Sequence, residues 1–328
     1  MTELLMKYEL CIVIINYKTP TLLIDCLESL KTELNDNSVV AIVDNASNDQ
    51  SVDVINSWLI DNNAKNSFHL ICSPHNGGFS SGNNTGINAF NADCYLLLNS
   101  DTLVRKGAIA TLLSSMNADK SIGIVAPRLE WPDGTAQESC FKFHSPVSEF
   151  LASAKTGAIT RLLQHAVVPQ PVSDSAQNYD WVSFACVMIR ADVIQMIGVM
   201  DDRYFMYFED VEYCHRAKKA GWQIKYEPAA HVVHLRGGTS PVKAQAKLRK
   251  RIPRYFYESR TRYFFQVYGR IGLFLANSLW TLGWMISSMR RCFSKNYLPD
   301  VSEKQWMDIW TNFFNPEKPY LHPEKYGK

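Results

Sequence analysis

Four short apolar runs that each end in polar residues constrain the fold of this 328-residue chain more than any other feature. The runs have the length of buried strands, and the segments between them have the spacing of amphipathic helices. This alternation predicts an α/β domain with a largely parallel sheet. Because ligands of such sheets bind beyond the carboxyl ends of the strands, the polar residues after each run are candidate site residues. The runs are Leu10–Asn16, Val39–Asp44, Phe68–Cys72 and Cys94–Asn99.

The charge is balanced over the whole chain but unevenly distributed along it. The totals of 34 basic and 32 acidic side chains argue against a nucleic-acid binder that works through overall charge. From Pro241 to the end there are 16 basic and 6 acidic residues, which leaves 18 and 26 in the first 240. We therefore predict two parts, a main α/β domain over residues 1–240 and a basic, helical, membrane-associating region over residues 241–328.

The cysteines and the N-terminus predict a cytoplasmic location. The eight cysteines include no C-x-x-C pair, and several lie in apolar runs, where a reduced thiol behaves as a small hydrophobe. The first ten residues lack the apolar stretch and the small-residue cleavage site of a signal peptide.

Further elements are predicted in the second half of the chain. The segment Trp181–Ile189 has the composition of a strand. A helix is expected from about Glu209 to Ala220, because Gly221 follows two lysines and provides a C-terminal signal. From Val242 onward the pattern is helical.

The segment VDNASNDQS places the carboxylate of Asp44 at the end of a strand. Acidic residues at such positions accept hydrogen bonds from ribose hydroxyls in nucleotide-binding folds. Taken alone, the segment is explained better as an N-cap for a helix that begins near Asp49.

A glycine-rich loop from Asn76 to Gly86 leads into a predicted helix, so its backbone N–H groups could approach a ligand closely. The loop has neither the dinucleotide-binding nor the P-loop fingerprint. Turn geometry explains the glycines equally well.

The segment Leu96–Thr102 delivers Asp101 just beyond an apolar strand, two residues after Asn99. One carboxylate at a strand end suits Mg²⁺ or Mn²⁺, because these cations take the remaining ligands from substrate phosphates. An Asx turn with a solvated Asp101 is the structural alternative.

The densest cluster of acidic side chains lies between Met200 and Glu212, where five acids are interleaved with four aromatic residues. Glu209 and Asp210 begin the predicted helix there. Desolvation would raise the pKa of a carboxylate at this place and the helix dipole would lower it, a combination that suits a general base. An acidic N-terminal cap of an ordinary helix is the competing interpretation.

Two histidines, His231 and His234, lie three residues apart in a strand-like stretch, and so on opposite faces, which argues against a shared metal ion. Arg236, two glycines and two hydroxyl residues follow up to Ser240, a composition that suits a diphosphate.

These five segments, in this order, resemble the bacterial family 2 inverting glycosyltransferases, and within them the rhamnosyltransferase-like branch that builds surface polysaccharides. The resemblance covers roughly Glu9 to Tyr268. It implies a GT-A fold, a Rossmann-like nucleotide-diphospho-sugar transferase domain, here with a helical C-terminal extension.

The resemblance also implies roles for individual residues. Asp210, paired with Glu209, would be the catalytic base. Asp101 would be the remaining acid of the family's D-x-D metal motif, with His234 completing the site for a divalent cation, Mg²⁺ or Mn²⁺. Asn99 stands where that motif has its first acid, so metal dependence is implied less strongly. The donor would be bound by Asn16, Tyr17, Asp44, Asn45, Asn76, Gly77, Gly78, Asn83, Asn99 and Ser100.

The implied reaction is the transfer of a sugar with inversion from a nucleotide-sugar donor, dTDP-rhamnose or a UDP-sugar, to a glycan or lipid-linked oligosaccharide acceptor. A sugar nucleotidyltransferase shares the sheet and the metal acids, but its triphosphate loop would contain glycine, which Asn16–Pro20 lacks. A non-catalytic, membrane-associated scaffold derived from a transferase is the third alternative.

The basic region contains a charge-free stretch from Ile271 to Met289, with arginines before and after it. The stretch is just long enough to span a bilayer. Asn277, Thr281 and Ser288 fall on one helical face, which favours a helix lying on an anionic membrane surface over a spanning or a buried core helix. We therefore expect a peripheral protein on the inner face of the cell membrane.

Overall fold

The computed structural model describes residues 6–236, 241–293 and 297–326. The chain forms two compact units, each built from separate stretches of sequence. The first comprises Met1–Phe141, Pro171–Asp202 and Tyr213–Thr239, and the second comprises Lys142–Gln170, Arg203–Glu212 and Ser240–Lys328. The second unit thus includes two segments from the middle of the chain as well as the predicted C-terminal region. The predicted domain boundary between residues 240 and 241 stays a prediction.

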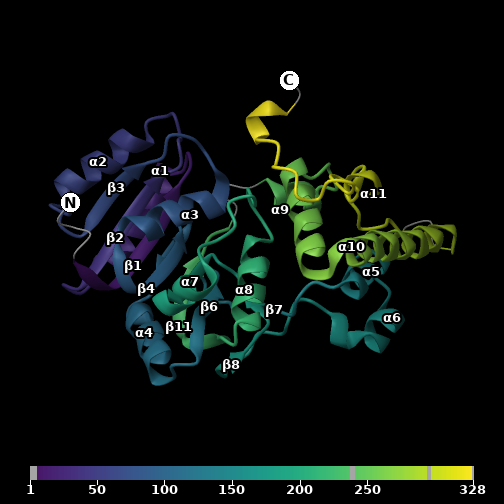
Figure 1. Cartoon of the computed structure of the whole chain (residues 1–328), viewed down its shortest axis with the longest axis horizontal. Coiled ribbons are helices and arrows are strands. Elements are labelled where there is room, and N and C mark those ends of the chain that lie inside the picture. The colour runs from purple at the N-terminus through teal and green to yellow at the C-terminus, as the bar shows by residue number, and fades with distance from the viewer. Residues whose placement is uncertain (1–5, 237–240, 294–296, 327–328) are drawn as a thin grey trace. The chain divides into compact units, whose positions relative to one another are not determined.

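The first unit is built on a mixed sheet (Figure 1). Its strands in chain order are β1 (Lys7–Asn16), β2 (Ser38–Asp44), β3 (Phe68–Cys72), β4 (Asn91–Asn99), β5 (Thr102–Val104), β6 (Ile122–Glu130), β8 (Gln177–Asn178), β10 (Cys186–Arg190) and β11 (Gln223–His234). In space the order is β3-β2-β1-β4-β10-β6-β11-β5, and β8 pairs with β11. The first four strands are parallel to one another, which confirms the predicted α/β class.

The strand register aligns the ends of the parallel strands. Asn16 lies opposite Asp44, and Asn99 lies opposite the residue before Asn16. The polar residues that follow β1, β2 and β4 therefore meet at one edge of the sheet, as the apolar runs predicted.

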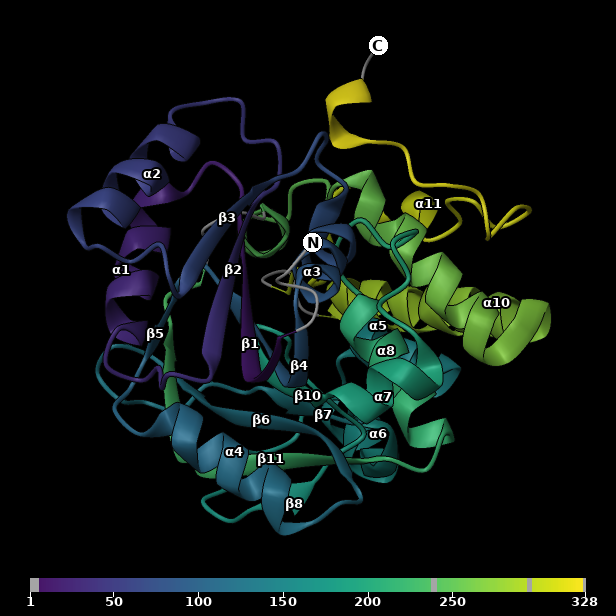
Figure 2. The same ribbon diagram turned by 60° about the vertical axis from the view of Figure 1, so that its left-hand side comes forward.

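Helices cover both faces of this sheet (Figure 2). Helices α1, α2 and α4 contribute apolar side chains to one core with alternate residues of the strands. Helix α3 lies on the opposite face of β1, where a Cβ at Gly82 or Gly86 would come within 3.0 Å of Ile15 or Val13. The helices are α1 (Pro20–Leu30), α2 (Ser51–Asp61), α3 (Gly78–Ala89), α4 (Ala108–Ala118), α7 (Ala191–Ile197) and α8 (Glu209–Lys219), the last of which confirms the predicted helix.

The prediction of one strand over Trp181–Ile189 is wrong in its continuity. The segment forms two strands, β9 (Trp181–Val182) and β10, in different sheets. Trp181 stacks on Phe141 of β7 (Cys140–Phe141), with ring centroids 4.1 Å apart. The intervening Ala185 carbonyl accepts a hydrogen bond from the Asn99 N–H (2.9 Å). Long-range partners on each side therefore divide a run that is apolar in sequence apart from Ser183.

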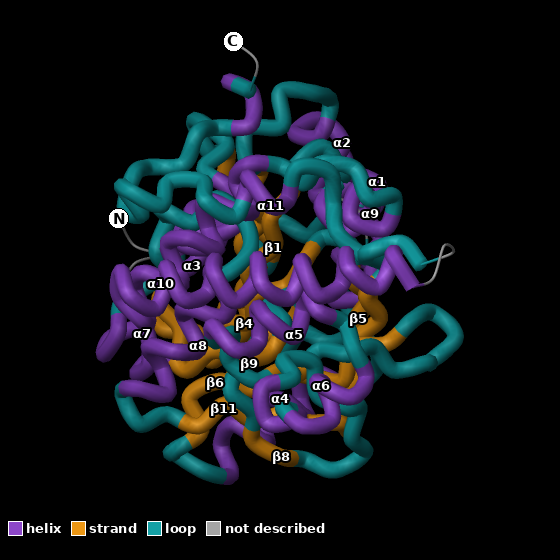
Figure 3. The backbone as a smooth tube through the Cα atoms, turned by 90° about the vertical axis from the view of Figure 1, so that its right-hand side faces the viewer, coloured by secondary structure: helices purple, strands orange, loops and turns teal. Residues whose placement is uncertain are grey.

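The second unit is helical, as predicted for the C-terminal region (Figure 3). Its helices are α5 (Pro146–Ala154), α6 (Gly157–Leu162), α9 (Val242–Lys247), α10 (Arg254–Phe293) and α11 (Gln305–Asp308). Helix α10 is interrupted at Gly269, whose φ of 66° is readily adopted only by glycine. We call residues 254–268 the first arm of α10 and residues 270–293 its second arm.

Within the described residues, none of the helices is both long and apolar enough to cross a bilayer. This holds for the stretch Ile271–Met289, which forms most of the second arm.

Candidate functional site

The carboxylate of Asp44 is held by hydrogen bonds from β1 and from the turn after β2. Its Oδ1 accepts from Asn16 Nδ2 (2.8 Å) and from the Ser47 hydroxyl (2.6 Å), and its Oδ2 accepts from the Ser47 N–H (3.1 Å). Asp44 and Asn16 are both buried. This geometry fixes an acid at the carboxyl edge of the sheet. The predicted N-cap role is not observed, because Gln50 occupies the N-cap position of α2 and no side chain caps it.

The glycine-rich loop is tied to the end of β2 through Asn45. Its Nδ2 donates to Asn76 Oδ1 and to the Gly78 carbonyl, both at 3.0 Å. Gly78 has a φ of 82°, which favours glycine, while Asn83 is buried and donates to the Phe79 carbonyl (3.1 Å). Gly78 therefore supports the turn-geometry interpretation, and Gly82 and Gly86 allow α3 to pack on β1, while the ligand-binding interpretation stays a prediction.

The turn after β4 brings Asn99, Ser100 and Asp101 to the same edge. The Ser100 hydroxyl lies 3.2 Å from the Thr19 hydroxyl at the start of α1, and the Asn99 carbonyl accepts from Thr102 (2.7 Å). Ser100 and Asp101 are buried, so Asp101 is not the solvated turn residue of the structural alternative. Tyr17, which is half-buried, lies between Asn16 and Lys18, whose ammonium is 5.2 Å from the Tyr17 ring centroid.

The pairing of β11 with β5 brings His234 to Asp101. His234 lies opposite Thr102 in the register, and its Nε2 is 3.5 Å from Asp101 Oδ1. His234 is 9% exposed, and its Nδ1 is buried with no hydrogen-bond partner among the described residues. The carboxylate of Asp101 suits Mn²⁺ or Mg²⁺, so the pair fits a cation that takes its other ligands from a substrate.

The structure separates the two histidines as predicted. His231 Nδ1 lies 2.9 Å from Glu130 Oε2, away from Asp101. In the described part of the chain, no group of three or more His, Cys, Asp or Glu side chains could hold a metal ion. Arg236 donates to Gln137, and Gly237, Gly238, Thr239 and Ser240 lie outside the described residues.

Glu209 and Asp210 belong to the second unit, where two residues with positive φ precede them. Tyr207 and Phe208 have φ values of 72° and 66°, an uncommon conformation for aromatic residues. The Phe208 ring lies against those of His144, Phe256 and Tyr263, with centroids 5.2–5.6 Å away. Backbone strain of this kind is concentrated at functional sites and persists only where the surrounding packing holds it.

Burial and limited hydrogen bonding set the proton affinity of this carboxylate pair. Burial raises the pKa of Asp210 to about 6, against the lowering effect of backbone N–H donors and of the Lys243 charge. Burial, followed by the proximity of Asp210, raises the pKa of Glu209 well above its usual value. Glu209 Oε2 is buried without a hydrogen-bond partner among the described residues. A carboxylate with a pKa near 6 can accept a proton at neutral pH.

Several residues in these networks were not singled out from the sequence. Ser47 and Thr19 bond to the donor-edge residues, and Lys243 lowers the pKa of Asp210. The hydrogen bonds between Ser47 and Asp44 have a local sequence signal, because a serine follows an aspartate by three residues in a turn. The other contacts join segments distant in sequence, and nothing local indicates them.

The comparisons with known proteins agree with this architecture. Residues 11–159 match the family model described as Glycosyl transferase family 2. A low-salt glycan biosynthesis hexosyltransferase of Haloferax volcanii, Agl10, is 26% identical over 230 residues, which cover 69% of this chain and 67% of the relative. An N-acetylglucosaminyl-diphospho-decaprenol L-rhamnosyltransferase of Mycobacterium tuberculosis is 28% identical over 148 residues, or 43% of this chain and 47% of the relative.

Solved glycosyltransferase structures share the fold at low identity. The mannosyltransferase PcManGT from Pyrobaculum calidifontis, in complex with GDP-Man and Mn²⁺, has a TM-score of 0.51 at 12% identity, covering 96% of this chain and 87% of that one. S. aureus TarS in complex with UDP-GlcNAc has a TM-score of 0.53 at 14% identity, covering 94% and 82%. The matched domain, the relatives and the sheet together lead to one conclusion. Residues 11–159 are similar to a family 2 glycosyltransferase domain, and the chain has the GT-A fold.

Proposed function

We propose that this glycosyltransferase moves a sugar with inversion from a nucleoside-diphosphate donor to a lipid-linked glycan, with dTDP-rhamnose as the first donor to test and UDP-sugars as the second. The alignment of Asn16, Asp44 and Asn99 at one sheet edge carries the proposal. The choice of sugar is supported by the relative named as an L-rhamnosyltransferase that acts on a diphospho-decaprenol-linked sugar. Surface polysaccharide synthesis is the corresponding process.

In this proposal the first unit binds the donor. Hydrogen bonds fix the position of the Asp44 carboxylate, which accepts a hydrogen bond from the nucleoside. Asn45 and the Gly77–Asn83 segment lie beside it. Asp101 and His234 would hold a divalent cation, which supplies positive charge for the diphosphate when bound. Mn²⁺ accompanies GDP-Man in one structure of the same fold, which supports testing that ion first.

The second unit supplies the base. The Asp210 carboxylate removes the proton of an acceptor hydroxyl as its oxygen forms a bond to the anomeric carbon. The bond from that carbon to the diphosphate oxygen breaks, and the nucleoside diphosphate leaves with the electron pair. One displacement inverts the anomeric centre, so a single catalytic carboxylate suffices. The raised pKa of Asp210 supports this role.

A lipid-linked acceptor would be presented at a membrane, and we propose that the enzyme acts on the cytoplasmic, anionic face of the cell membrane. The excess of basic residues after Pro241 supports this location, because anionic lipids attract clustered Lys and Arg.

A screen of nucleotide sugars tests the donor. We expect dTDP-rhamnose or a UDP-sugar to raise the melting temperature of the protein, and Mn²⁺ to increase that shift. The one-bond carbon–proton coupling constant at the anomeric carbon then gives the configuration of the transferred sugar. Comparison with the configuration in the donor tests inversion. A retained configuration would disprove the single displacement, and stabilisation by nucleoside triphosphates but by no nucleotide sugar would favour a nucleotidyltransferase.

A further inference from the structure

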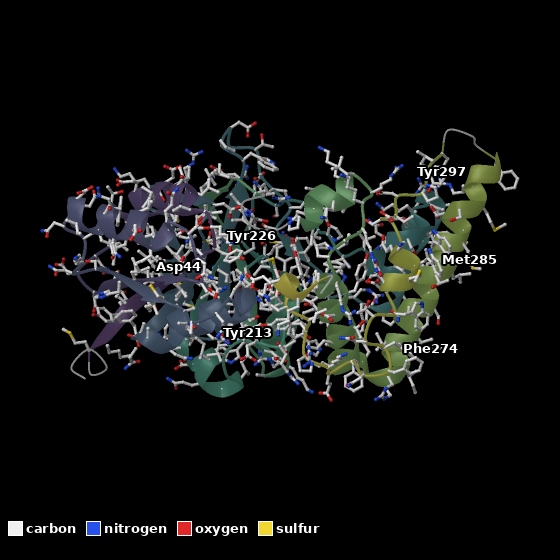
Figure 4. The ribbon with its side chains drawn as sticks, turned by 90° about the horizontal axis from the view of Figure 1, so that it is seen from above. Asp44, Tyr213, Tyr226, Phe274, Met285 and Tyr297 are labelled. Atoms are coloured by element: carbon white, nitrogen blue, oxygen red, sulfur yellow. The ribbon has the colours of Figure 1, made fainter. Side chains whose placement is uncertain are left out.

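The second arm of α10 has large apolar side chains on its exposed side. Every strongly exposed position between 271 and 289 carries one, and Ile271 and Met289 are 78% and 62% exposed. Figure 4 shows Phe274 and Met285 projecting from α10 at the margin of the second unit. We call the following set the apolar face: Ile271, Phe274, Leu275, Leu282, Met285 and Met289.

The opposite side of the same arm faces the protein and carries Asn277, Gly283 and Ser287 beside the buried apolar Leu273 and Trp280. Asn277 is fully buried and accepts a hydrogen bond from Arg260 Nη1 (2.7 Å). A Cβ at Gly283 would lie 2.2 Å from Ser153 Oγ and 2.5 Å from the Phe150 carbonyl, so α5 packs directly on the helix backbone. A helix at a water-exposed surface normally carries polar side chains on its exposed side.

This finding changes the interpretation of the predicted polar face. Asn277 was expected to lie with Thr281 and Ser288 on one face of a helix at a membrane surface. Instead Asn277 points into the second unit, where it completes a network with Arg260 and Glu149. The outward side is therefore more apolar than the sequence pattern indicated.

Exposed apolar side chains continue beyond α10. Phe274 lies near Trp310 and Phe313, with centroids 6.4 Å from each, and the neighbouring Phe314 is 89% exposed. Trp306 stacks on Trp284 at 6.4 Å and remains half-exposed. Aromatic side chains of this kind suit the boundary between lipid headgroups and acyl chains.

The charged residues of α10 that flank the apolar face are positive. Arg270 precedes it and Arg290 follows it, and the sequence from 259 to 299 contains no Asp or Glu. A symmetric pair of chains joined through this face would bring cations together without an acidic partner. Anionic lipid headgroups would instead neutralise them.

We infer that the apolar face lies in the boundary of an anionic bilayer, with the second arm of α10 parallel to the membrane surface. The apolar side chains enter the outer acyl region, Arg270 and Arg290 contact lipid phosphates, and the polar side of the helix stays packed on α5. This inference rests on the proposed membrane location and identifies the apolar face as the surface that binds the membrane.

Flotation of the full chain with vesicles tests the inference. We expect the protein to float with vesicles of phosphatidylcholine and phosphatidylglycerol, and much less with phosphatidylcholine alone. Met289→Glu should lower the partition into the mixed vesicles by about tenfold, because the Met side chain no longer enters the lipid. Met196→Glu is the matched control, since Met196 in the first unit is 61% exposed and should leave flotation unchanged.

Two results would overturn the inference. One is equal flotation of Met289→Glu and the wild-type chain. The other is a wild-type dimer in light scattering without lipid that becomes monomeric in Met289→Glu, because this would assign the face to a second copy. Donor-induced thermal stabilisation, measured without vesicles, shows that each variant is folded and tests the proposed transfer separately from the membrane contact.

Discussion

The carboxylates of Asp44 and Asp210 differ in their hydrogen bonding. Asp44 accepts three hydrogen bonds, from the Asn16 amide, the Ser47 hydroxyl and the Ser47 N–H. Asp210 accepts from backbone N–H groups at the start of α8, and burial raises its pKa to about 6. Hydrogen bonds favour the charged form of an acid, whereas desolvation disfavours it. These differences support the proposed roles, with the first carboxylate holding a ligand and the second taking up a proton.

Replacing the proton acceptor should have the largest effect. Asp210→Asn keeps the shape of the side chain and removes the base, so we expect sugar transfer to fall about a thousandfold. The donor-induced shift in melting temperature should be unchanged, because the donor contacts lie in the first unit. Asp202→Asn, the same change at an exposed position in the same segment, serves as the control. Near-normal turnover of Asp210→Asn would contradict the assignment of the base.

Replacing Asp44 should lower the affinity for the donor more than it lowers the rate of sugar transfer. Asp44→Asn removes a charged acceptor and turns an amide toward the Asn16 and Ser47 donors, so donor affinity should fall about a hundredfold. Calorimetric titration with the nucleoside diphosphate measures this, and turnover at saturating donor should change less. Asp49→Asn, exposed in the same loop, is the matched control. Unchanged affinity with only a lower melting temperature would reduce Asp44 to a structural role.

Replacing each of the two histidines of β11 in turn distinguishes a loss of cation binding from a general loss of stability. His234→Asn should reduce about tenfold the gain in donor affinity that Mn²⁺ provides, because a ligand beside Asp101 is lost. His231→Asn breaks a contact with Glu130 and should leave that gain intact. Titration of the donor with and without Mn²⁺ gives both values. An equal Mn²⁺ effect in the wild-type chain and in His234→Asn would exclude His234 as a ligand.

The smallest predicted effect is the dependence of kcat/KM on pH. Because the pKa of Asp210 is raised to about 6, kcat/KM should be half its plateau value near pH 6 and fall further as the pH decreases, since the protonated acid cannot act as a base. The same shift means that the folded state binds this proton more tightly than the unfolded state. Ionising Asp210 therefore costs stability as the pH rises through 6. A profile that stays flat from pH 5 to pH 8 would contradict the role of Asp210.

The alternation of apolar runs and helical segments was sufficient to predict the sheet. Strand ends are marked locally by a change from apolar to polar residues, so Asn16, Asp44 and Asn99 could be identified as site candidates before their alignment was known. The same local signal failed at Trp181–Ile189. Whether that run is one strand or two depends on partners elsewhere in the chain.

The sequence by itself determined the α/β class, the polar edge of the sheet and the positions of the candidate acids, because these depend on the periodicity and order of neighbouring residues. Only the tertiary structure decided that Asp44 accepts three hydrogen bonds, that His234 faces Asp101, and that Tyr207 and Phe208 adopt positive φ. It also decided that Asn277 points inward and that the exposed side of the second arm of α10 is apolar. These features depend on contacts between segments far apart in the chain, and such contacts produce no local pattern of apolar and polar residues in the sequence.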